Sequence, residues 1–320
     1  MGGSETDTNP LIIREMPHRS AFALAIVVAL VATACSLAST SATVPLAAAS
    51  ASPPPTAQRT TAPTPAPTPS PTAPPWQALP DPANDPTALA AQLVMAEGFI
   101  RDPKPTAAQL AWAGHMEQLG IARLADFPEW TDPVLAALAA EPRAAIAGSM
   151  EAGKQLRAMH AGPIPKNLPD WHIVQPPPID ELMTYYKEAE AKFGVPWYFL
   201  ASINLIETRM GRIRGDSSAG AQGPMQFIPS TWAAYGEGDV NSYRDSILAA
   251  GRYLRAAGAP GNMPRAVFAY NHDTRYVAAV TGYAEVMHAD PAAYRGYYGW
   301  QVYYPTKDGP ILMAPGWKKE

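Results

Sequence analysis

The sequence has little cysteine, few charged residues and no long apolar run, and each shortage excludes a class of protein. One cysteine among 320 residues cannot form an internal disulfide, so the chain is not a disulfide-stapled scaffold. The six histidines show no paired spacing with that cysteine or with one another, so no Cys/His zinc cluster is expected. Charged residues make up 16%, against about 25% in a typical domain. The net charge of −4 gives no electrostatic footprint for nucleic acid.

Proline, by contrast, is abundant: the chain has 36, roughly twice the usual share of about 5%. Ten of them fall between Pro53 and Pro75, in a stretch made almost entirely of Pro, Thr, Ala and Ser. Alternating prolines cannot donate backbone hydrogen bonds and favour an extended polyproline conformation, and nothing in the stretch can build a core. We therefore predict a disordered, semi-rigid linker over residues 36–85, with a reach of about 3 Å per residue.

Residues 1–35 have the pattern of an export segment. A basic flank precedes an apolar run over residues 21–34, which is shorter than the about 20 residues that a membrane-spanning helix needs. The small residues before Cys35 resemble a bacterial lipoprotein cleavage box with Cys35 as the lipidated residue, although Ala32 stands where that box favours leucine. Two other interpretations stay open, a signal cleaved elsewhere, for example near residues 47–49, and an uncleaved anchor.

The remainder of the chain is predicted to be mainly helical. Over residues 86–175 apolar residues recur at helical spacing and no cluster suited to catalysis is present, so we predict a helical accessory region. After three prolines, an amphipathic helix over residues 179–193 ends at Gly194. A second helix begins at Pro196 and is apolar on nearly all sides, so it should be buried.

Glu207 lies at the C-terminal end of this buried helix. The helix dipole and the apolar surroundings both disfavour a negative charge there, so we expect a raised pKa for the Glu207 carboxyl. A carboxyl that stays protonated near neutral pH is what a general acid requires. Taken alone, the position favours a simpler interpretation, a glutamate that turns to water or pairs with Arg209 or Arg212.

Two later motifs change that balance. Gln226 lies between the apolar residues Met225 and Phe227, where a buried amide needs a partner such as a sugar hydroxyl or a catalytic carboxyl. Further on, Tyr270 and Asn271 stand at the end of a third apolar helix. Together with Glu207 these residues make a series of three ordered motifs, which is a much more specific signal than any one of them.

The series resembles the lytic transglycosylase domain, over roughly residues 179–287. The resemblance depends on Glu207-Thr208 with Gly211, on Ser217-x-Ala219-Gly220-Ala221-x-Gly223-x-Met225-Gln226-Phe227-x-Pro229-x-Thr231, and on Ala269-Tyr270-Asn271. The version with Pro224 and Trp232 is most similar to the murein transglycosylases of high-GC Gram-positive bacteria. That family is α-helical and lysozyme-like, related to goose-type lysozyme, so the resemblance implies a mainly α chain with its catalytic domain over residues 176–290.

The resemblance implies that Glu207 is the single catalytic acid and base. It would protonate the glycosidic oxygen between N-acetylmuramic acid and N-acetylglucosamine, and then accept the proton of the muramoyl C6 hydroxyl, which attacks C1 and leaves a 1,6-anhydro sugar. The substrate-binding positions that it implies are Ser217, Met225, Gln226, Phe227, Tyr270 and Asn271. No cofactor is implied. The expected partners are peptidoglycan glycan strands and, through the N-terminal anchor, the outer face of the cytoplasmic membrane.

Two features depart from the family or add to it. One branch carries an Asp/Gly-rich loop that resembles a calcium site, but residues 236–241 are too few for such a loop, so no metal is expected. Arg209, Arg212 and Arg214 follow Glu207 closely. They either attract the lactyl or stem-peptide carboxylates of the glycan, or form a solvated basic loop with internal pairs.

The last segment, residues 291–320, is rich in aromatic side chains. Trp300, Val302 and Tyr304 alternate, and Asp308-Gly309 is a hairpin turn signal before a second apolar run, so we predict a small β-hairpin. The hairpin either packs on the helical domain or extends the glycan cleft.

Two alternatives from other classes stay open. A muramidase that hydrolyses the same bond would need a second carboxylate or a positioned water, and the candidate carboxylates are Asp216, Glu237, Asp239 and Asp273. A non-catalytic, glycan-binding lipoprotein would keep the fold alone. Glu207 together with Ser217 and Gln226 argues against that second alternative, because a decayed site would tolerate loss of the acid.

Overall fold

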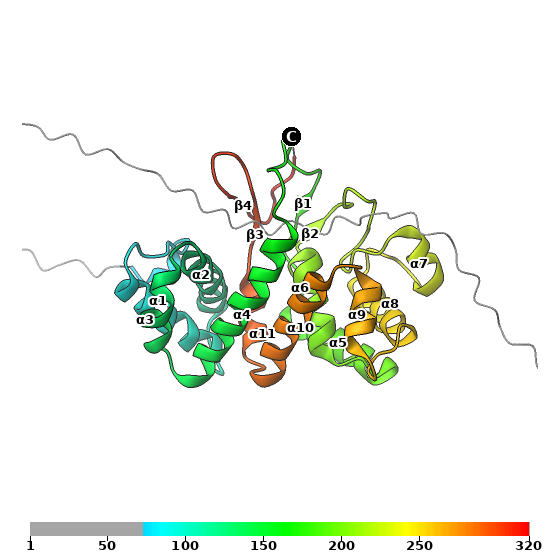
Figure 1. Cartoon of the computed structure of the whole chain (residues 1–320), viewed down its shortest axis with the longest axis horizontal. Helices are drawn as coiled ribbons and strands as arrows, with labels where there is room; N and C mark the ends of the chain where they lie inside the picture. The colour runs from blue at the N-terminus through cyan, green and yellow to red at the C-terminus, as the bar shows by residue number, and fades with distance from the viewer. Residues whose placement is uncertain (1–72, 320) are drawn as a thin grey trace, which may run out of the picture. The chain divides into compact units, whose positions relative to one another are not determined.

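The computed structural model describes residues 73–319, so the export segment, Cys35 and most of the linker lie outside the described residues. Within 73–319, eleven α-helices and two small antiparallel sheets make a mainly α fold, as predicted and consistent with the lysozyme-like class (Figure 1). These residues form two compact units. Unit 1 comprises Pro169–His272 with residues 316–319, and unit 2 comprises residues 73–168 with Asp273–Pro315. No helix among the described residues is both long and apolar enough to cross a membrane.

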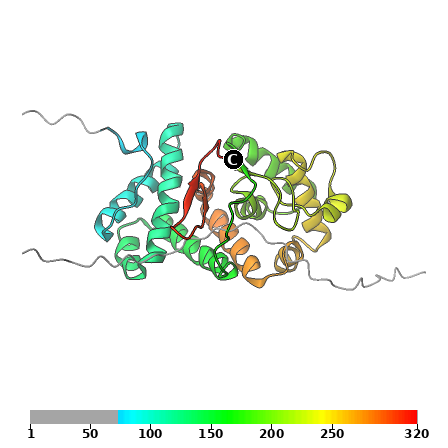
Figure 2. The same ribbon diagram turned by 90° about the horizontal axis from the view of Figure 1, so that it is seen from above.

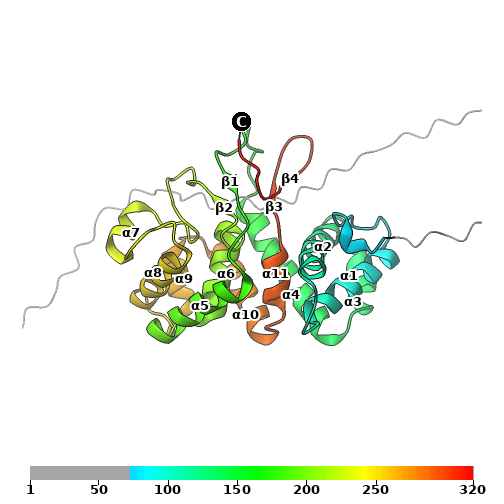
Figure 3. The ribbon, with the colours of Figure 1, turned by 180° about the vertical axis from the view of Figure 1, so that it is seen from behind.

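Unit 1 holds every residue of the predicted active site. Its elements are β1 (His172–Ile173), α5 (Ile179–Phe193), α6 (Trp197–Thr208), β2 (Ile213–Arg214), α7 (Pro229–Tyr235), α8 (Tyr243–Ala256) and α9 (Met263–Tyr270). The predicted end of α5 is confirmed, since Gly194 adopts a left-handed φ of 70° and its N–H caps the helix. The prediction of a buried α6 is also confirmed, because every residue of that helix except Tyr198 is buried. Helix α5 packs on α8 (Figure 3).

The end of the chain returns to the strand with which unit 1 begins. Ile173 pairs with Ile213 in the antiparallel β1–β2 sheet. On its other side, the Ile173 N–H donates to the carbonyl of Trp317 at 2.8 Å, and the Gly316 N–H donates to the carbonyl of Ile173 at 2.7 Å. The red C-terminal segment accordingly ends beside the green β1 region (Figure 2). Residues 316–318 therefore extend the small sheet of unit 1.

Unit 2 is helical with one hairpin. Its elements are α1 (Pro86–Arg101), α2 (Ala107–Asp126), α3 (Thr131–Ala136), α4 (Ala140–Met159), α10 (Thr274–Ala289), α11 (Ala293–Gly299), β3 (Val302–Tyr304) and β4 (Ile311–Met313), with short 3₁₀ turns at Pro75–Gln77 and Pro128–Trp130. The hairpin is confirmed, with Gly309 at a φ of 107° in its turn. Asp85 caps α1, and Thr106 forms a capping box with Gln109 at the start of α2.

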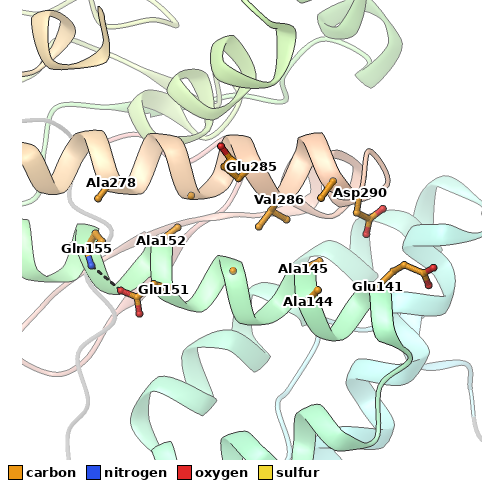
Figure 4. A pocket seen from close by; sticks show the side chains of 13 residues that line it. Glu141, Ala144, Ala145, Glu151, Ala152, Gln155, Ala278, Glu285, Val286 and Asp290 are labelled. Carbon is orange, nitrogen blue, oxygen red and sulfur yellow. Dashed lines mark hydrogen bonds between the residues drawn. The ribbon is translucent and has the colours of Figure 1, made fainter. Parts of the chain in front are cut away.

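Helices α4 and α10 approach closely because small residues line their contact. A side-chain carbon at Gly148 would lie 2.5 Å from Val286 Cγ2, and one at Gly282 would lie 3.0 Å from Ala152 Cβ. A groove of about 610 Å³ runs over this contact, with alanine and glycine on its floor and the carboxylates Glu141, Glu151, Glu285 and Asp290 among its lining (Figure 4). None of the predicted site residues lines it.

Unit 2 also encloses two carboxyl groups that the sequence did not predict to be buried. Glu97 on α1 and Glu117 on α2 are only 3% and 1% exposed. Burial raises the pKa of Glu97 to about 7 and holds the pKa of Glu117 well above its usual range. Trp300 Nε1 donates to Glu117 Oε2 at 2.9 Å, and Arg101 pairs with both Glu97 and Asp290. The pair is thus held between α1, α2 and the segment around α11.

Candidate active site

Glu207 is the last residue but one of α6 and is only 4% exposed. Directly after the helix the chain turns through three residues with positive φ, Arg209 at 54°, Met210 at 59° and Gly211 at 82°. Such backbone costs about 1–3 kcal/mol for each residue that carries a side chain, so it persists only where the surroundings impose it. At Gly211 a side-chain carbon would lie 2.2 Å from the ring of Tyr243, so only glycine fits there. The carboxyl therefore stands immediately before a strained reversal of the chain.

A loop over residues 215–227 is tied to α6 beside this carboxyl. Asn204 Nδ2 and Thr208 Oγ1 both donate to the carbonyl oxygen of Pro224, at 2.8 and 2.5 Å. Thr208 follows Glu207 directly, and Asn204 lies one helical turn before Thr208. The loop is therefore anchored on the same turn of helix that carries Glu207.

Helix α9 holds the loop from another direction through Tyr270. Its hydroxyl donates to the carbonyl oxygen of Met225 at 2.6 Å, and its ring centroid lies 5.9 Å from that of Phe227. Burial raises the pKa of Tyr270 well above its usual range, and the charge of nearby Glu207 and then Tyr253 raise it further. Glu207 and Tyr270 are thus electrostatic neighbours, brought together from α6 and α9.

Two of the predicted polar residues, Ser217 and Gln226, shape the loop itself. Ser217 Oγ accepts the N–H groups of Ala219 at 3.2 Å and Ala221 at 3.0 Å. Gln226 is buried with a left-handed φ of 50°, and its Nε2 donates to the carbonyl of Gly223 at 3.0 Å. Among the described residues with a side chain, a positive φ occurs only at Arg209, Met210 and Gln226. All of these strained positions flank the candidate site.

The remaining predicted residues are placed as follows. Met225 is 0% exposed and Phe227 is 2% exposed, so both side chains pack inside unit 1. Asn271 is the C-cap residue of α9 and is half-buried. That these three residues contact substrate stays a prediction, as does the corresponding role of Ser217 and Gln226.

The arginines after Glu207 differ from one another in exposure. Arg209 and Arg212 are only 3% and 2% exposed, and Arg209 Nη1 donates to the Leu205 carbonyl at 3.0 Å. Arg214 is half-buried, lies 4.3 Å from the ring of Tyr243 and donates to the Asn241 carbonyl at 2.8 Å. The expectation of a solvated basic loop is therefore wrong for Arg209 and Arg212, whose side chains help to build the interior.

The four carboxylates considered for a hydrolytic mechanism all have partners within the chain. Glu237 pairs with Arg252 at 2.9 Å, Asp273 pairs with Arg275 at 2.5 Å and caps α10, Asp239 accepts the Asn241 N–H at 2.9 Å, and Asp216 accepts from Gln222 Nε2 at 3.4 Å. Among the described residues, no group of three or more His, Cys, Asp or Glu side chains could hold a metal ion.

Sequence reasoning missed Asn204, a fully buried residue with hydrogen bonds on both ends of its amide. A signal for it was present, because Asn204 is an amide inside an otherwise apolar helix, four residues before Thr208. Residues at that spacing are neighbours on a helix surface, and a buried amide must find partners.

No protein-family model matches the chain, and no solved structure matches it. A curated protein that it resembles belongs to the lytic murein transglycosylases. That relative is the membrane-bound lytic murein transglycosylase F of Thiobacillus denitrificans, 29% identical over 143 residues, which cover 39% of this chain and 30% of the relative. The chain therefore spans less than a third of the length of the relative that it matches.

Proposed function

We propose that this chain is a peptidoglycan lytic transglycosylase that cleaves the bond between N-acetylmuramic acid and N-acetylglucosamine. The observation that carries the proposal is the placement of Glu207, a buried carboxyl at the end of an apolar helix, next to a strained turn and a doubly anchored loop. The similarity to a lytic murein transglycosylase supports the same activity class.

In the proposed mechanism Glu207 acts twice. Its protonated carboxyl first gives its proton to the glycosidic oxygen while the bond from that oxygen to C1 breaks. The resulting carboxylate then takes the proton of the C6 hydroxyl, whose oxygen forms a new bond to C1 and closes the 1,6-anhydro ring. No water is consumed, so one group that changes from acid to base suffices, where most glycoside hydrolases use two carboxyls. The Tyr270 hydroxyl donates its hydrogen bond to the carbonyl oxygen of Met225, so the proposal assigns both proton transfers to Glu207.

The alternative of a muramidase is less well supported. Hydrolysis requires a second carboxylate or a held water opposite the acid. Each of the four candidate carboxylates already has a partner within the chain, and the best paired of them, Asp273, is bound to Arg275 and caps a helix of unit 2. These contacts favour the anhydro product over the reducing sugar.

We further propose that the chain is exported and acts at the outer face of the membrane or in the cell wall, with Cys35 as its lipid-bearing residue. The N-terminal sequence pattern supports this, and the relative is described as membrane-bound. The motif with Pro224 and Trp232 supports a murein transglycosylase of the high-GC Gram-positive type.

The test is digestion of purified peptidoglycan by the full chain and by Glu207→Gln, with mass analysis of the soluble fragments. Wild-type protein should release fragments one water lighter than the reducing-end products. The variant should lose on the order of 10²–10⁴-fold in rate, the usual contribution of a general acid–base group. Reducing ends would indicate the muramidase instead, and a fully active Glu207→Gln would contradict the catalytic assignment.

A further inference from the structure

Three fully buried polar side chains meet beneath the last turn of α6. They are Tyr186 from α5 and Asn204 and Thr208 from α6 itself, each with no exposed surface. Tyr186 donates its hydroxyl proton to Asn204 Oδ1 at 2.7 Å, and Asn204 Nδ2 donates both to Thr208 Oγ1 at 3.2 Å and to the Pro224 carbonyl at 2.8 Å. The amide of Asn204 is thus satisfied at both ends.

Thr208 extends the same network to the strained turn. Its hydroxyl donates to the Pro224 carbonyl at 2.5 Å and accepts the N–H of Gly211 at 3.0 Å. Gly211 is the last of the three residues with positive φ after Glu207. The side chain of Thr208, the residue after Glu207, therefore contacts both the strained turn and the loop.

The loop is fixed at two consecutive carbonyl oxygens. The Pro224 oxygen accepts from Asn204 and Thr208 on α6, and the Met225 oxygen accepts from Tyr270 on α9. Gln226, the next residue, is held in a left-handed conformation. Gln226 therefore follows directly on two residues whose carbonyl oxygens are bound by side chains of α6 and α9.

Three buried polar side chains stabilise a core less efficiently than apolar side chains would. Desolvating an amide and two hydroxyls offsets much of what their hydrogen bonds contribute, and apolar side chains of similar volume fill such space at least as well. A fully satisfied buried network instead fixes one geometry. Everything that this network joins borders the helical turn of Glu207, so the geometry that it fixes is that of the candidate site.

We propose that Asn204 and Thr208 are positioning residues, which hold the loop that carries Gln226 at a set distance from the carboxyl of Glu207. The proposal rests on the proposed transglycosylase function and deepens it. Displacing reacting groups by about 1 Å can cost on the order of 10²-fold in rate, while a bound glycan keeps most of its contacts. Loss of the network should therefore lower kcat far more than it changes KM.

Thr208→Val tests this most directly, because it keeps the shape of the side chain and removes the hydroxyl. On soluble, uncrosslinked glycan strands we expect kcat to fall about 10- to 100-fold and KM to change less than about threefold. Thr208→Ser restores the hydroxyl and should stay within about threefold of the wild type. Tyr186→Phe removes the donor to Asn204 from another helix, and should lower kcat in the same direction by a smaller factor.

The matched control is Ser149→Ala in unit 2. Ser149 is equally buried, and its hydroxyl is hydrogen-bonded to Tyr297 at 2.6 Å and to the Ala145 carbonyl at 2.7 Å. We expect Ser149→Ala to lower the melting temperature about as much as Thr208→Val does, and to leave kcat unchanged. An equal loss of kcat in both variants would reduce the role of Thr208 to stability and would overturn the proposal.

Amide hydrogen exchange supplies a readout that does not depend on activity. Within the loop, the N–H of Gln222 donates to the carbonyl of Phe227 at 2.9 Å, and the N–H of Phe227 donates to the carbonyl of Gln222 at 2.8 Å. Their amides should exchange at least about tenfold faster in Thr208→Val, while those of α8 stay unchanged. Two results would contradict the positioning role and leave the proposed function standing. One is an unchanged rate of amide hydrogen exchange in the loop of Thr208→Val, and the other is an active wild type with an unchanged kcat in Thr208→Val. A wild-type chain that cleaves no glycan would instead contradict the proposed function, and this inference with it.

Discussion

The phenolic hydroxyl of Tyr270 donates a 2.6 Å hydrogen bond to the carbonyl oxygen of Met225. The resemblance implied that Tyr270 occupies a substrate-binding position. In the structure the Tyr270 hydroxyl donates its hydrogen bond to the loop, and the raised pKa of Tyr270 keeps the hydroxyl protonated across the physiological pH range. Tyr270 therefore links α9 to the loop residue that precedes Gln226.

We expect Tyr270→Phe to lower activity through the loop, while the ring packing on Phe227 stays intact. The Met225 carbonyl loses its partner, which should cost about 1–3 kcal/mol of unfolding free energy, measured by denaturant titration. Tyr253→Phe is the control, because Tyr253 also donates to a carbonyl, that of Ala269 at 2.5 Å, but not to the loop. If the control lost as much activity as Tyr270→Phe, the loop would not be the cause.

The two glycines of the loop offer a test of backbone fit. Gly220 and Gly223 have nearly the same φ, 75° and 73°. A side-chain carbon at Gly220 would meet nothing within 4 Å, whereas one at Gly223 would lie 1.9 Å from the Val240 carbonyl oxygen. We expect Gly220→Ala to cost about 1–2 kcal/mol, the penalty of left-handed backbone. Gly223→Ala should cost clearly more and should also abolish activity, as thermal melts and glycan digestion would show; equal effects would exclude the close approach.

The stability of unit 2 should depend on pH through its buried carboxyls. The pKa of Glu97 in the folded chain is about 7, above its unfolded value of 4.5, so the folded state holds the proton more tightly. The contribution of Glu97 to the free energy of unfolding is therefore fully present below pH 4.5. It declines as the pH rises and is lost above about pH 7, a change on the order of 3 kcal/mol. The melting temperature of the full chain, recorded between pH 4.5 and 8, measures this decline.

Replacing Glu97 should flatten that pH profile. Glu97→Gln removes the carboxyl whose pKa is about 7, and it also removes the neighbouring charge that helps to raise the pKa of Glu117. We expect a weaker decline of the melting temperature between pH 4.5 and pH 8. Glu151→Gln, at an exposed carboxyl on α4, should leave the profile unchanged. A steep profile that persists in Glu97→Gln would contradict the assignment of the decline to Glu97.

The arginines after Glu207 should act on stability more than on substrate preference. Arg209→Ala removes a buried guanidinium, and we expect a loss of at least about 2 kcal/mol of unfolding free energy. Arg214→Ala, at a half-buried site, should cost less than about 1 kcal/mol. Neither should change the ratio of rates on peptide-bearing and peptide-free glycan. A changed ratio in Arg209→Ala would restore the idea that this arginine attracts stem-peptide carboxylates.

Local signals account for the elements that the sequence predicted well. Apolar periodicity and Gly194 define α5, the unbroken apolar pattern defines α6, and the Asp308-Gly309 turn defines the hairpin of unit 2. The pairing of α4 with α10 was not predicted, because it depends on Gly148 and Gly282 lying opposite larger residues of the other helix. Single glycines in a helical pattern say little about such contacts until both helices are placed.

In the candidate site, too, the sequence predicted positions better than long-range contacts. The motif gave the positions of Glu207, Gln226 and Tyr270, and the structure brings their segments together. Local roles were harder to predict, because Met225 acts through its backbone carbonyl while its side chain is buried. Asn204 belongs to the site through long-range hydrogen bonds, to Pro224 and Tyr186, that no local pattern reveals.

The interleaving of the two units along the chain has a consequence for synthesis. A polypeptide made from its N-terminus completes residues 73–168 early, yet the α10 helix on which α4 packs arrives more than a hundred residues later. The backbone hydrogen bonds of Ile173 to the C-terminal segment likewise cannot form until residues 316–318 have been added. Unit 2 cannot complete its helical packing before residues 273–315 have been added, and unit 1 cannot complete its sheet before residues 316–318 have been added, so the two units are completed in close succession. A shortened version that stops at residue 290 would leave both units incomplete, and one that stops at residue 315 would leave unit 1 without the segment that pairs with Ile173.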